Sequence, residues 1–417
     1  MSRWVTEKLG DISEMCLGKM LDENKNKGTL QPYLANINVR WGSFDFVNLK
    51  KMRFEKREQD RYSLKFGDLV ICEGGEPGRC AIWKDEIPGM KIQKALHRVR
   101  VNSNYSNEFV YYCFLLAGRN GELNKHFIGS TIKHLTGIGL KQVEITSPPL
   151  KDQQKIAAVL TALDAKIYCN NRINAELEAI ARTLYDYWFV QFNFPDHNGQ
   201  PYKSSGGKMV YNSILKHQIP AGWRDGTLDN LGQISGGSTP STKNPQNFTP
   251  NGTPWITPKD LSDNQGNKFI TRGAQGVSDE GIKNACLKIY PTGTVLLSSR
   301  APVGYMAIAQ GELTTNQGFK SFVPTSGYST PFIYYTVKNS LKAITQYASG
   351  STFMEISGAV LKTVKICLPD SENVQRYTHA VESIFKRQNL LEQENQHLTQ
   401  LRDWLLPMMM NSQVTVV

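Results

Sequence analysis

The chain has 417 residues, which is too long for one compact core and indicates two or three domains. Hydrophobic residues make up 40% of the sequence, and no run approaches the roughly 18 uninterrupted apolar residues of a membrane helix. The start, MSRWVTEKLGDI, lacks the apolar core of a signal peptide, so we expect a cytoplasmic protein. Seven cysteines occur singly, without a C-x-x-C pair, which argues against a disulfide framework and against a zinc ribbon.

The net charge of +11 is concentrated in two blocks of the chain. Residues 1–150 carry 23 Lys and Arg against 17 Asp and Glu, and residues 222–370 carry 13 against 9. Such a positive surplus attracts polyanions, of which nucleic acid is the usual one for a soluble protein. A solvated basic surface without a ligand is the alternative interpretation.

The first block has the pattern of mixed helix and strand. Residues 68–72, DLVIC, form a β-rich apolar run directly after a glycine turn, which predicts a strand. The block ends in the phrase GSTIKHLTGIGLKQVEITSP, residues 129–148.

A long helix is predicted after the first block. From Ile156 onward apolar residues recur three and four positions apart, and nothing breaks the run before Phe194-Pro195. At about 1.5 Å per residue, some 35 to 40 residues form a rod of roughly 50 to 60 Å, longer than a globular domain requires. The Gly, Pro, Ser and Asn content of residues 191–221 then marks a connector.

The second block repeats the plan of the first. Residues 294–298, TVLLS, are again predicted to be a strand after a glycine turn, and Thr330-Pro331 is typical of an N-cap followed by the first helical residue. Residues 350–369, GSTFMEISGAVLKTVKICLP, match residues 129–148 at a step of 221, with nine of twenty positions identical. FVYY at 109–112 likewise resembles FIYY at 332–335. The chain therefore contains a duplication whose middle segments have diverged.

A second long helix follows the second block. Its apolar residues continue the correspondence at the step of 221: Tyr377, Val381, Ile384, Leu398 and Leu405. Two rods with matching stripes bury them most simply against each other, as a coiled coil. Asn174 and Asn395 occupy equivalent places near this seam, where a polar residue costs stability but can fix the register. The alternative is that both asparagines lie at the edge of the stripe.

Motifs of catalysis are absent from the sequence. It contains neither a G-x-x-x-x-G-K-[ST] phosphate loop nor a G-x-S-x-G nucleophile elbow. The Asn/Asp-Pro-Pro-aromatic signature of amino-methyltransferases is missing, and the seven histidines show no metal-ligand spacing. Catalysis by this chain therefore finds little support.

Cationic, amide and hydroxyl side chains gather at equivalent places in the two blocks. In the first block these are Lys91, Gln93, Lys94, His97 and Arg98, and in the second they are Ser299, Arg300, Asn316, Gln317 and Lys320. Lys and Arg can bind the O6/N7 edge of guanine, Asn and Gln the N6/N7 edge of adenine, and hydroxyls either phosphate or base. We predict these ten residues as DNA contacts; for any one of them, a solvated loop side chain is the alternative.

Several phrases resemble one known family over essentially the whole chain. LYDYWFVQFNFP, GQPYKSSGGKMV, TIKHLTGIGLKQVEITSPPLKDQQKIAAVL and WLLPMMMNSQV resemble the specificity subunit of type I restriction-modification systems. GGSTPSTKNP, PWITPKDL, SSRAPVG and NQGFK are similar to that family's recognition-domain phrases, and YLANINVRWG, CEGGEPGRCAIW and QKALHRVR to another version of them. The first block has CLGKMLDEN where the second has its GGSTP phrase, so the sequence alone does not align their early contacts. Within these phrases, further predicted DNA contacts are Lys19, Arg40, Arg79, Thr239, Ser241, Lys243 and Lys259.

The resemblance implies an α+β fold with a pseudo-twofold internal repeat. Two duplicated mixed α/β target-recognition domains, residues 1–150 and 222–370, would be separated by two long antiparallel helices in a coiled coil. The helices would span residues 151–190 and 371–411, with the connector at 191–221 and a tail at 412–417.

The resemblance also implies a function and a set of partners. The chain would read a bipartite, asymmetric site in double-stranded DNA, with no catalytic activity and no bound cofactor. Two methyltransferase subunits would dock on it and use S-adenosylmethionine to methylate adenine, and a restriction subunit that uses ATP and Mg²⁺ can join them. The alternatives are a self-sufficient DNA nuclease or methyltransferase and a free-standing, duplicated DNA-binding regulator.

Overall fold

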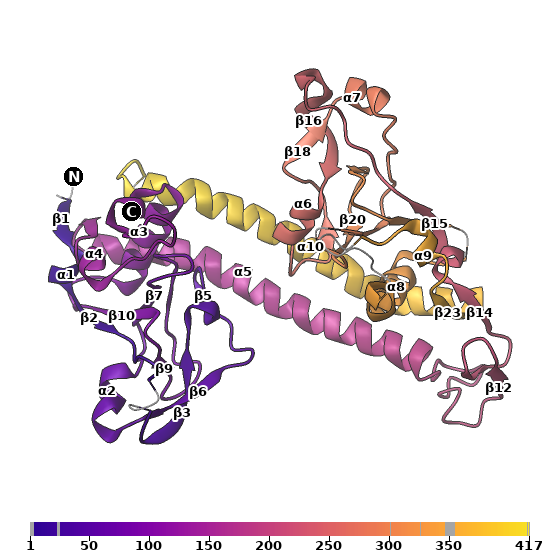
Figure 1. Ribbon diagram of the computed structural model, residues 1–417, viewed down its shortest axis with the longest axis horizontal. Helices are drawn as coiled ribbons and strands as arrows, with labels where there is room; N and C mark the ends of the chain where they lie inside the picture. The colour runs from indigo at the N-terminus through magenta and orange to yellow at the C-terminus, as the bar shows by residue number, and fades with distance from the viewer. Residues whose placement is uncertain are drawn as a thin grey trace. The chain divides into compact units, whose positions relative to one another are not determined.

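The computed structural model describes residues 4–22, 26–300, 302–325, 327–346, 355–414 and 416. The chain divides into two compact units, of which the first is built from two segments distant in sequence and the second from one continuous segment (Figure 1). The first unit comprises Met1–Tyr168 with His397–Val417, and the second comprises Cys169–Gln396. The two long helices are therefore each shared between the units.

The first unit contains a four-stranded antiparallel sheet and a three-stranded sheet. The four-stranded sheet has the order β2 (Ser13–Leu17), β10 (Leu96–Val101), β7 (Leu69–Cys72), β8 (Cys80–Ile82). The three-stranded sheet has the order β6 (Lys50–Phe54), β3 (Thr29–Leu34), β9 (Lys91–Ile92). Two strand pairs complete it, β1 (Val5–Lys8) with β11 (Glu144–Ser147) and β4 (Val39–Arg40) with β5 (Ser43–Phe44). Its short helices are α1 (Leu9–Ile12), α2 (Gln59–Tyr62), α3 (Asn107–Arg119) and α4 (Gly137–Lys141).

The second unit contains a five-stranded sheet and a three-stranded sheet. The five-stranded sheet has the order β15 (Gly232–Ser235), β22 (Ser321–Pro324), β19 (Val295–Leu297), β20 (Met306–Ala309), β17 (Phe269–Ile270). The three-stranded sheet has the order β18 (Gln275–Val277), β16 (Phe248–Ile256), β21 (Thr314–Thr315). Two strand pairs are β14 (Arg224–Thr227) with β23 (Lys365–Leu368) and β12 (Met209–Asn212) with β13 (His217–Pro220). Its helices include α6 (Pro258–Asp263), α7 (Asp279–Asn284), α8 (Thr330–Gln346) and α9 (Gly358–Leu361).

The sheet orders confirm the duplication that the sequence predicts. The order β2-β10-β7-β8 recurs as β15-β22-β19-β20, and the second unit adds β17 at the edge. In both three-stranded sheets the central strand pairs antiparallel with one neighbour and parallel with the other. The two units therefore share one topology although their middle segments differ in sequence.

The predicted strands are confirmed, and the predicted helix start is nearly right. Strands β7 and β19 fall within the two apolar runs that follow glycine turns. Helix α8 begins at Thr330 itself, so Pro331 is its second residue. The Thr330 hydroxyl donates to the carbonyl of Gly293 at 2.8 Å. Residues 350–354 of the repeated phrase lie outside the described part of the chain.

The two long helices, α5 (Leu150–Tyr185) and α10 (Ser371–Met410), are antiparallel as expected. In the first unit Arg402 contacts Asp164, and in the second unit the Tyr377 hydroxyl donates to the carbonyl of Ala181. Residue numbers thus rise along one helix as they fall along the other. A π-helical segment, Asp186–Val190, extends α5 before the connector begins.

The asparagines of the helix seam are buried rather than at its edge. Asn174 is 8% exposed and Asn395 is 9% exposed. The Asn395 side chain accepts from Asn170 at 2.9 Å and donates to Asn171 at 2.7 Å. These amide bonds favour a role of Asn395 in fixing the register of the two helices, whereas the buried side-chain oxygen of Asn174 has no hydrogen-bond partner among the described residues.

The described helices include none long and apolar enough to cross a membrane.

Candidate nucleic-acid interface

Four loops that are far apart in the sequence meet in the second unit. The amide of Ser238 donates to the carbonyl of Thr315 at 3.0 Å, and the amide of Asn316 donates to that of Ile256 at 3.1 Å. The amide of Ser299 donates to the carbonyl of Gly318 at 2.8 Å, and Ile356 donates to Ser299 at 2.9 Å. We call the loops joined by the first three of these bonds, 236–243, 256–259, 299–300 and 315–320, the second loop cluster; the fourth bond attaches Ile356 to it.

Glycines allow the loops of the second cluster to approach each other closely. A Cβ on Gly237 would lie 2.0 Å from the carbonyl oxygen of Thr315, and one on Gly318 would lie 2.9 Å from a ring carbon of Pro258. The Trp255 indole donates to the carbonyl of Ser238 at 3.1 Å, and the Tyr290 hydroxyl donates to that of Gly236 at 2.7 Å. Gly237 and Gly318 thus leave the space that this close approach of the loops requires.

Polar side chains on this scaffold face the solvent. Thr239, Ser241, Lys243, Lys259 and Gln317 are exposed, whereas Arg300, Asn316 and Lys320 are half-buried. The Thr239 hydroxyl donates to the Gln317 side chain, and Asn316 accepts from the amide of Gly318 at 2.8 Å. The Arg300 guanidinium lies 3.9 Å from the Glu355 carboxylate. The structure therefore brings eight of the predicted contact residues into one region.

The first unit builds the corresponding cluster on the same four backbone hydrogen bonds. Lys19 donates to Ile92 at 3.0 Å, Gln93 to Leu34 at 3.0 Å, Glu73 to Ala95 at 2.9 Å and Leu135 to Glu73 at 2.8 Å. We call the loops around these bonds, 18–21, 34–40, 73–79 and 92–95, the first loop cluster. Gly18-Lys19 thus takes the place of Gly237-Ser238. The structure therefore aligns the segment CLGKMLDEN of the first block with the GGSTP segment of the second, which the sequence alone did not do.

The side chains of the first loop cluster differ from those of the second. Lys94 and Arg40 are exposed, while Gln93 and Arg79 are half-buried. Arg40 pairs with Asp45 at 3.3 Å, and Arg79 pairs with Glu76 at 2.7 Å. The Gln93 side-chain oxygen accepts from the amide of Ala95 at 3.1 Å. The same backbone frame therefore presents a different chemical surface.

Two lysines predicted as DNA contacts have buried side chains in the first unit. Lys19 is 4% exposed, and its ammonium pairs with Glu58 at 2.5 Å over the ring of Phe54. Lys91 is 2% exposed and donates to the Ser63 hydroxyl and the carbonyl of Gln59. Burial lowers the pKa of Lys91, because the ammonium loses its hydration. Both side chains are therefore bonded within the protein and do not face solvent, where DNA would bind.

Three further predicted contacts, His97, Arg98 and Ser299, are also buried. His97 and Arg98 lie on β10, whose neighbours β2 and β7 cover it on both edges. Arg98 pairs with Glu14 at 2.6 Å, and His97 shares a hydrogen bond with the carbonyl of Leu135 at 3.1 Å. Burial lowers the pKa of His97. We assign the side chains of His97 and Arg98 to the support of the fold, and because all three are buried we leave them out of the proposed DNA contacts.

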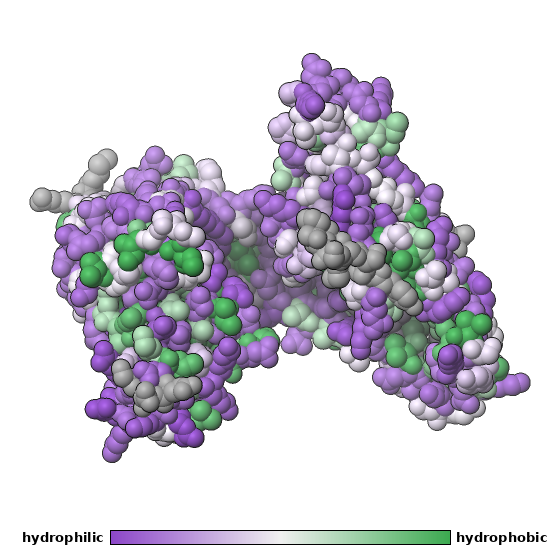
Figure 2. All heavy atoms as spheres, in the orientation of Figure 1, coloured by the Kyte–Doolittle hydropathy of each residue, from purple (hydrophilic) through white to green (hydrophobic). Residues whose placement is uncertain are grey.

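A basic surface that the sequence reasoning missed covers β6 and α2 in the first unit. Seven side chains there are exposed: Lys50, Lys51, Arg53, Lys56, Arg57, Arg61 and Lys65. Figure 2 shows hydrophilic residues over this end of the unit. The signal was the density of cations in KKMRFEKREQDRY, where buried Met52 and Phe54 alternate with exposed cations. This surface can bind phosphates next to the first loop cluster, since Lys19 bonds to the carbonyl of Arg53.

Comparison with known proteins identifies relatives over both units. A family model described as the type I restriction modification DNA specificity domain matches residues 1–179 and 220–400. The type I restriction enzyme HindI specificity subunit of Haemophilus influenzae is 24% identical over 469 aligned positions, covering 99% of this chain and 100% of that protein. The MjaIX specificity subunit of Methanocaldococcus jannaschii is 42% identical over 163 residues, which are 38% of this chain and 37% of that protein.

A solved structure shares the fold of the whole chain. The type I restriction-modification S subunit from M. genitalium superimposes with a TM-score of 0.58 and 16% identity, covering 98% of this chain and 96% of that one. At 16% identity this similarity shows only a shared fold, with two mixed α/β domains and long helices.

Proposed function

Since the chain belongs to the type I restriction-modification DNA specificity family, we propose that it reads a bipartite, asymmetric site in double-stranded DNA. Each loop cluster would read one half of the site. The helix pair of α5 and α10 would set the number of unread base pairs between the halves. DNA specificity is the property of the family. Our proposal is that the recognised sequence is divided into two half-sites, which we call words.

The observation that carries this proposal is the matched pair of loop clusters. The same four backbone hydrogen bonds hold both clusters together, yet the side chains that they present differ. The second cluster offers amides and hydroxyls, such as Gln317 and Thr239, and the first offers Lys94 and Gln93. Amides suit adenine and cations suit guanine in the major groove, so two unlike words are the expected result.

Basic surfaces would supply the sequence-independent part of the affinity. Lys243 and Lys259 in the second unit and the cations along β6 in the first are exposed. Lysine and arginine that neutralise phosphates release counterions, so binding should weaken steeply as salt rises. Side chains at base edges would add about 1–3 kcal/mol of discrimination for each good bidentate contact.

We further propose that the chain is a non-catalytic scaffold. Two methyltransferase subunits would dock on it and carry S-adenosylmethionine, and a restriction subunit with ATP and Mg²⁺ would complete a nuclease. What supports this is the naming of the relatives as specificity subunits of restriction enzymes. Action on cellular DNA would place the complex in the cytoplasm.

A reconstitution experiment tests the division of labour. The purified chain is incubated with DNA, Mg²⁺ and S-adenosylmethionine, alone and with a type I methyltransferase subunit. We expect DNA binding but no methylation or cleavage by the chain alone, and adenine methylation once the partner is added. Turnover by the chain alone would contradict the proposal in favour of a self-sufficient enzyme. Failure to bind the methyltransferase would favour a free-standing regulator.

A further inference from the structure

In the first unit a tyrosine of the recognition domain is bonded to both long helices through one carboxylate. The hydroxyl of Tyr112, on α3, donates to the Asp164 carboxylate of α5 at 2.7 Å. The other oxygen of Asp164 accepts from the Arg402 guanidinium of α10, also at 2.7 Å. Arg119, at the end of α3, pairs with Asp403 of α10 at 2.6 Å. Polar bonds thus fasten α3 to this part of the helix pair.

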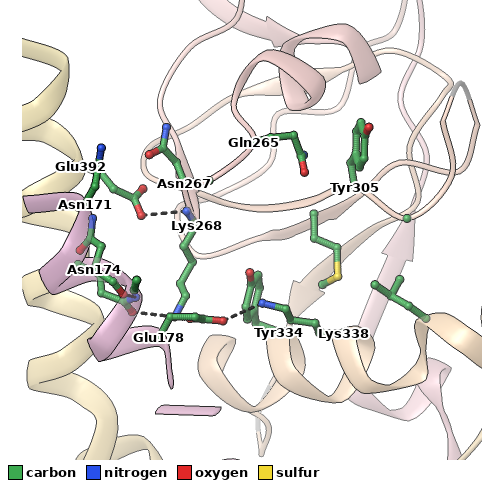
Figure 3. Close-up of a pocket in the computed structure, with 16 residues that line it drawn as sticks. Asn171, Asn174, Glu178, Gln265, Asn267, Lys268, Tyr305, Tyr334, Lys338 and Glu392 are labelled. Carbon is green, nitrogen blue, oxygen red and sulfur yellow. Dashed lines mark hydrogen bonds and ion pairs between the residues drawn. The ribbon is translucent and has the colours of Figure 1, made fainter. Parts of the chain in front are cut away.

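The second unit has a tyrosine in the same role. The hydroxyl of Tyr335, on α8, donates to the Glu178 carboxylate of α5 at 2.8 Å. Glu178 also pairs with Lys268 at 2.6 Å and with Lys338 at 2.7 Å. Figure 3 shows Glu178 between the two lysines, beside a cleft of about 600 Å³. The Lys268 ammonium reaches α10 as well, where it donates to Gln388 at 2.7 Å.

A second carboxylate strengthens the attachment in the second unit. Glu392, on α10, accepts the amides of Lys268 and Phe269 at 2.9 Å each. These residues lead into β17, the edge strand of the five-stranded sheet. The sheet that carries part of the second loop cluster is therefore tied to α10 through its backbone.

The two tyrosines are the same residue of the duplicated domain. Tyr112 ends the phrase FVYY and Tyr335 ends FIYY. Each hydroxyl reaches a carboxylate of α5, although the cation beside that carboxylate comes from α10 in the first unit and from the recognition domain in the second. The tyrosine–carboxylate bond is thus the common element of two otherwise different attachments.

We propose that Tyr112 and Tyr335 are positioning residues that hold each loop cluster in one orientation on the helix pair, and so restrict the spacing of the two DNA words. This inference rests on the proposed function. A hydrogen bond to a charged group is stronger than one between neutral groups, while apolar packing around both tyrosines keeps the domain folded. Removing the hydroxyl therefore leaves a domain that reads its word but tilts more easily.

Spacing is sensitive to such tilting because DNA is helical. One added base pair moves the second word by about 3.4 Å and turns it by roughly 35° about the axis. A rigid attachment rejects that displacement, and a loosened attachment tolerates part of it.

The test compares Tyr112→Phe and Tyr335→Phe, each assembled with the methyltransferase, on DNA whose spacer is the cognate length or one base pair shorter or longer. Tyr111→Phe and Tyr334→Phe are matched controls, because these adjacent buried tyrosines lose the same hydroxyl but make no bond to Asp164 or Glu178 among the described contacts. We expect the rate on wrong spacers relative to the cognate spacer to rise by about fivefold or more in the positioning variants. The controls should match the wild type.

Half-site binding separates positioning from general damage. Binding of a duplex that carries only one word should stay unchanged in the positioning variants. The inference is overturned if their spacing profile equals that of the controls, or if half-site binding weakens by the same factor as methylation. If one variant does not assemble, the other decides, since each unit has its own attachment. A wild-type complex that methylates no two-part site would instead overturn the proposed function.

Discussion

Polar side chains in this protein differ in what they are bonded to. Lys91 and Arg98 are buried and hydrogen-bonded to groups of the same unit. Thr239 and Gln317 are exposed and engaged mainly with each other. An exposed amide or hydroxyl can exchange its partner for a base edge at little cost, whereas a buried cation that lost its partner would be strongly penalised. Exposure therefore decides which residues can read DNA.

Substitution of Gln317 and of Lys243 should affect binding differently. Gln317→Ala should cost about 1–3 kcal/mol on the cognate word and relax the preference at one base position. Lys243→Ala should weaken binding to all sequences alike and reduce the slope of log K against log salt by about 1. Titrations of cognate and base-substituted duplexes at several salt concentrations check both. Equal, sequence-independent losses for the two variants would contradict a base-reading role for Gln317.

The pH dependence of stability should carry a contribution from Glu392. Burial raises the pKa of this carboxyl from 4.5 to about 7. Between these values the folded chain holds a proton that the unfolded chain has released, so the contribution is full below pH 4.5 and is lost as pH rises to about 7. The free energy of unfolding of wild type relative to Glu392→Gln should therefore fall by about 1–3 kcal/mol between pH 5 and pH 7. Denaturant unfolding at both pH values measures it, and an equal pH response of the two proteins would refute it.

The long helices are the elements that connect the two units. Their seam is apolar, with Leu160 and Tyr377 fully buried, and it is interrupted by the amide bonds of Asn395. Apolar contacts make the pairing stable, and the amide bonds restrict it to one register.

Loss of the Asn395 side chain should destabilise the helix pair. Asn395→Ala removes two hydrogen bonds and leaves the amides of Asn170 and Asn171 without that partner, at a cost of about 1–3 kcal/mol. Gln396→Ala on the same helix is the control, because Gln396 is exposed and should change stability by less than about 0.5 kcal/mol. Thermal unfolding of both variants measures the difference. Equal stabilities would show that the amide bonds do not hold the seam.

Local sequence patterns predicted the elements better than the contacts between them. Spacing of three and four located α5 and α10, and apolar runs after glycine turns located β7 and β19, because these signals lie within one segment. Sequence could not show that β10 is paired on both edges, since β2 and β7 are distant along the chain. His97 and Arg98 were therefore predicted as DNA contacts although they are buried. The equivalence of Gly18 and Gly237 could also not be predicted from sequence, because it became visible only from the backbone hydrogen bonds of the residues that follow them.

At the scale of the whole molecule, two basic units of one topology share a pair of helices. The helices α5 and α10, of 36 and 40 residues, are about three times as long as the average helix of a globular protein. Such length is consistent with the proposed role of the helices as a spacer.

Lengthening both helices should change the unread spacer and leave the words unchanged. Insertion of one heptad after Tyr168 and another after Gln396 keeps the seam in phase and adds about 10 Å, or roughly three base pairs of DNA. Sequencing of methylated sites should show the same two words with a longer gap. An unchanged gap would contradict the role of the helices as the spacer.

The most direct measurement is a genome-wide map of methylated adenines in cells that express this chain with its methyltransferase. The account predicts two short, unlike words separated by a fixed number of unread base pairs. A single uninterrupted word, or two identical words, would contradict it.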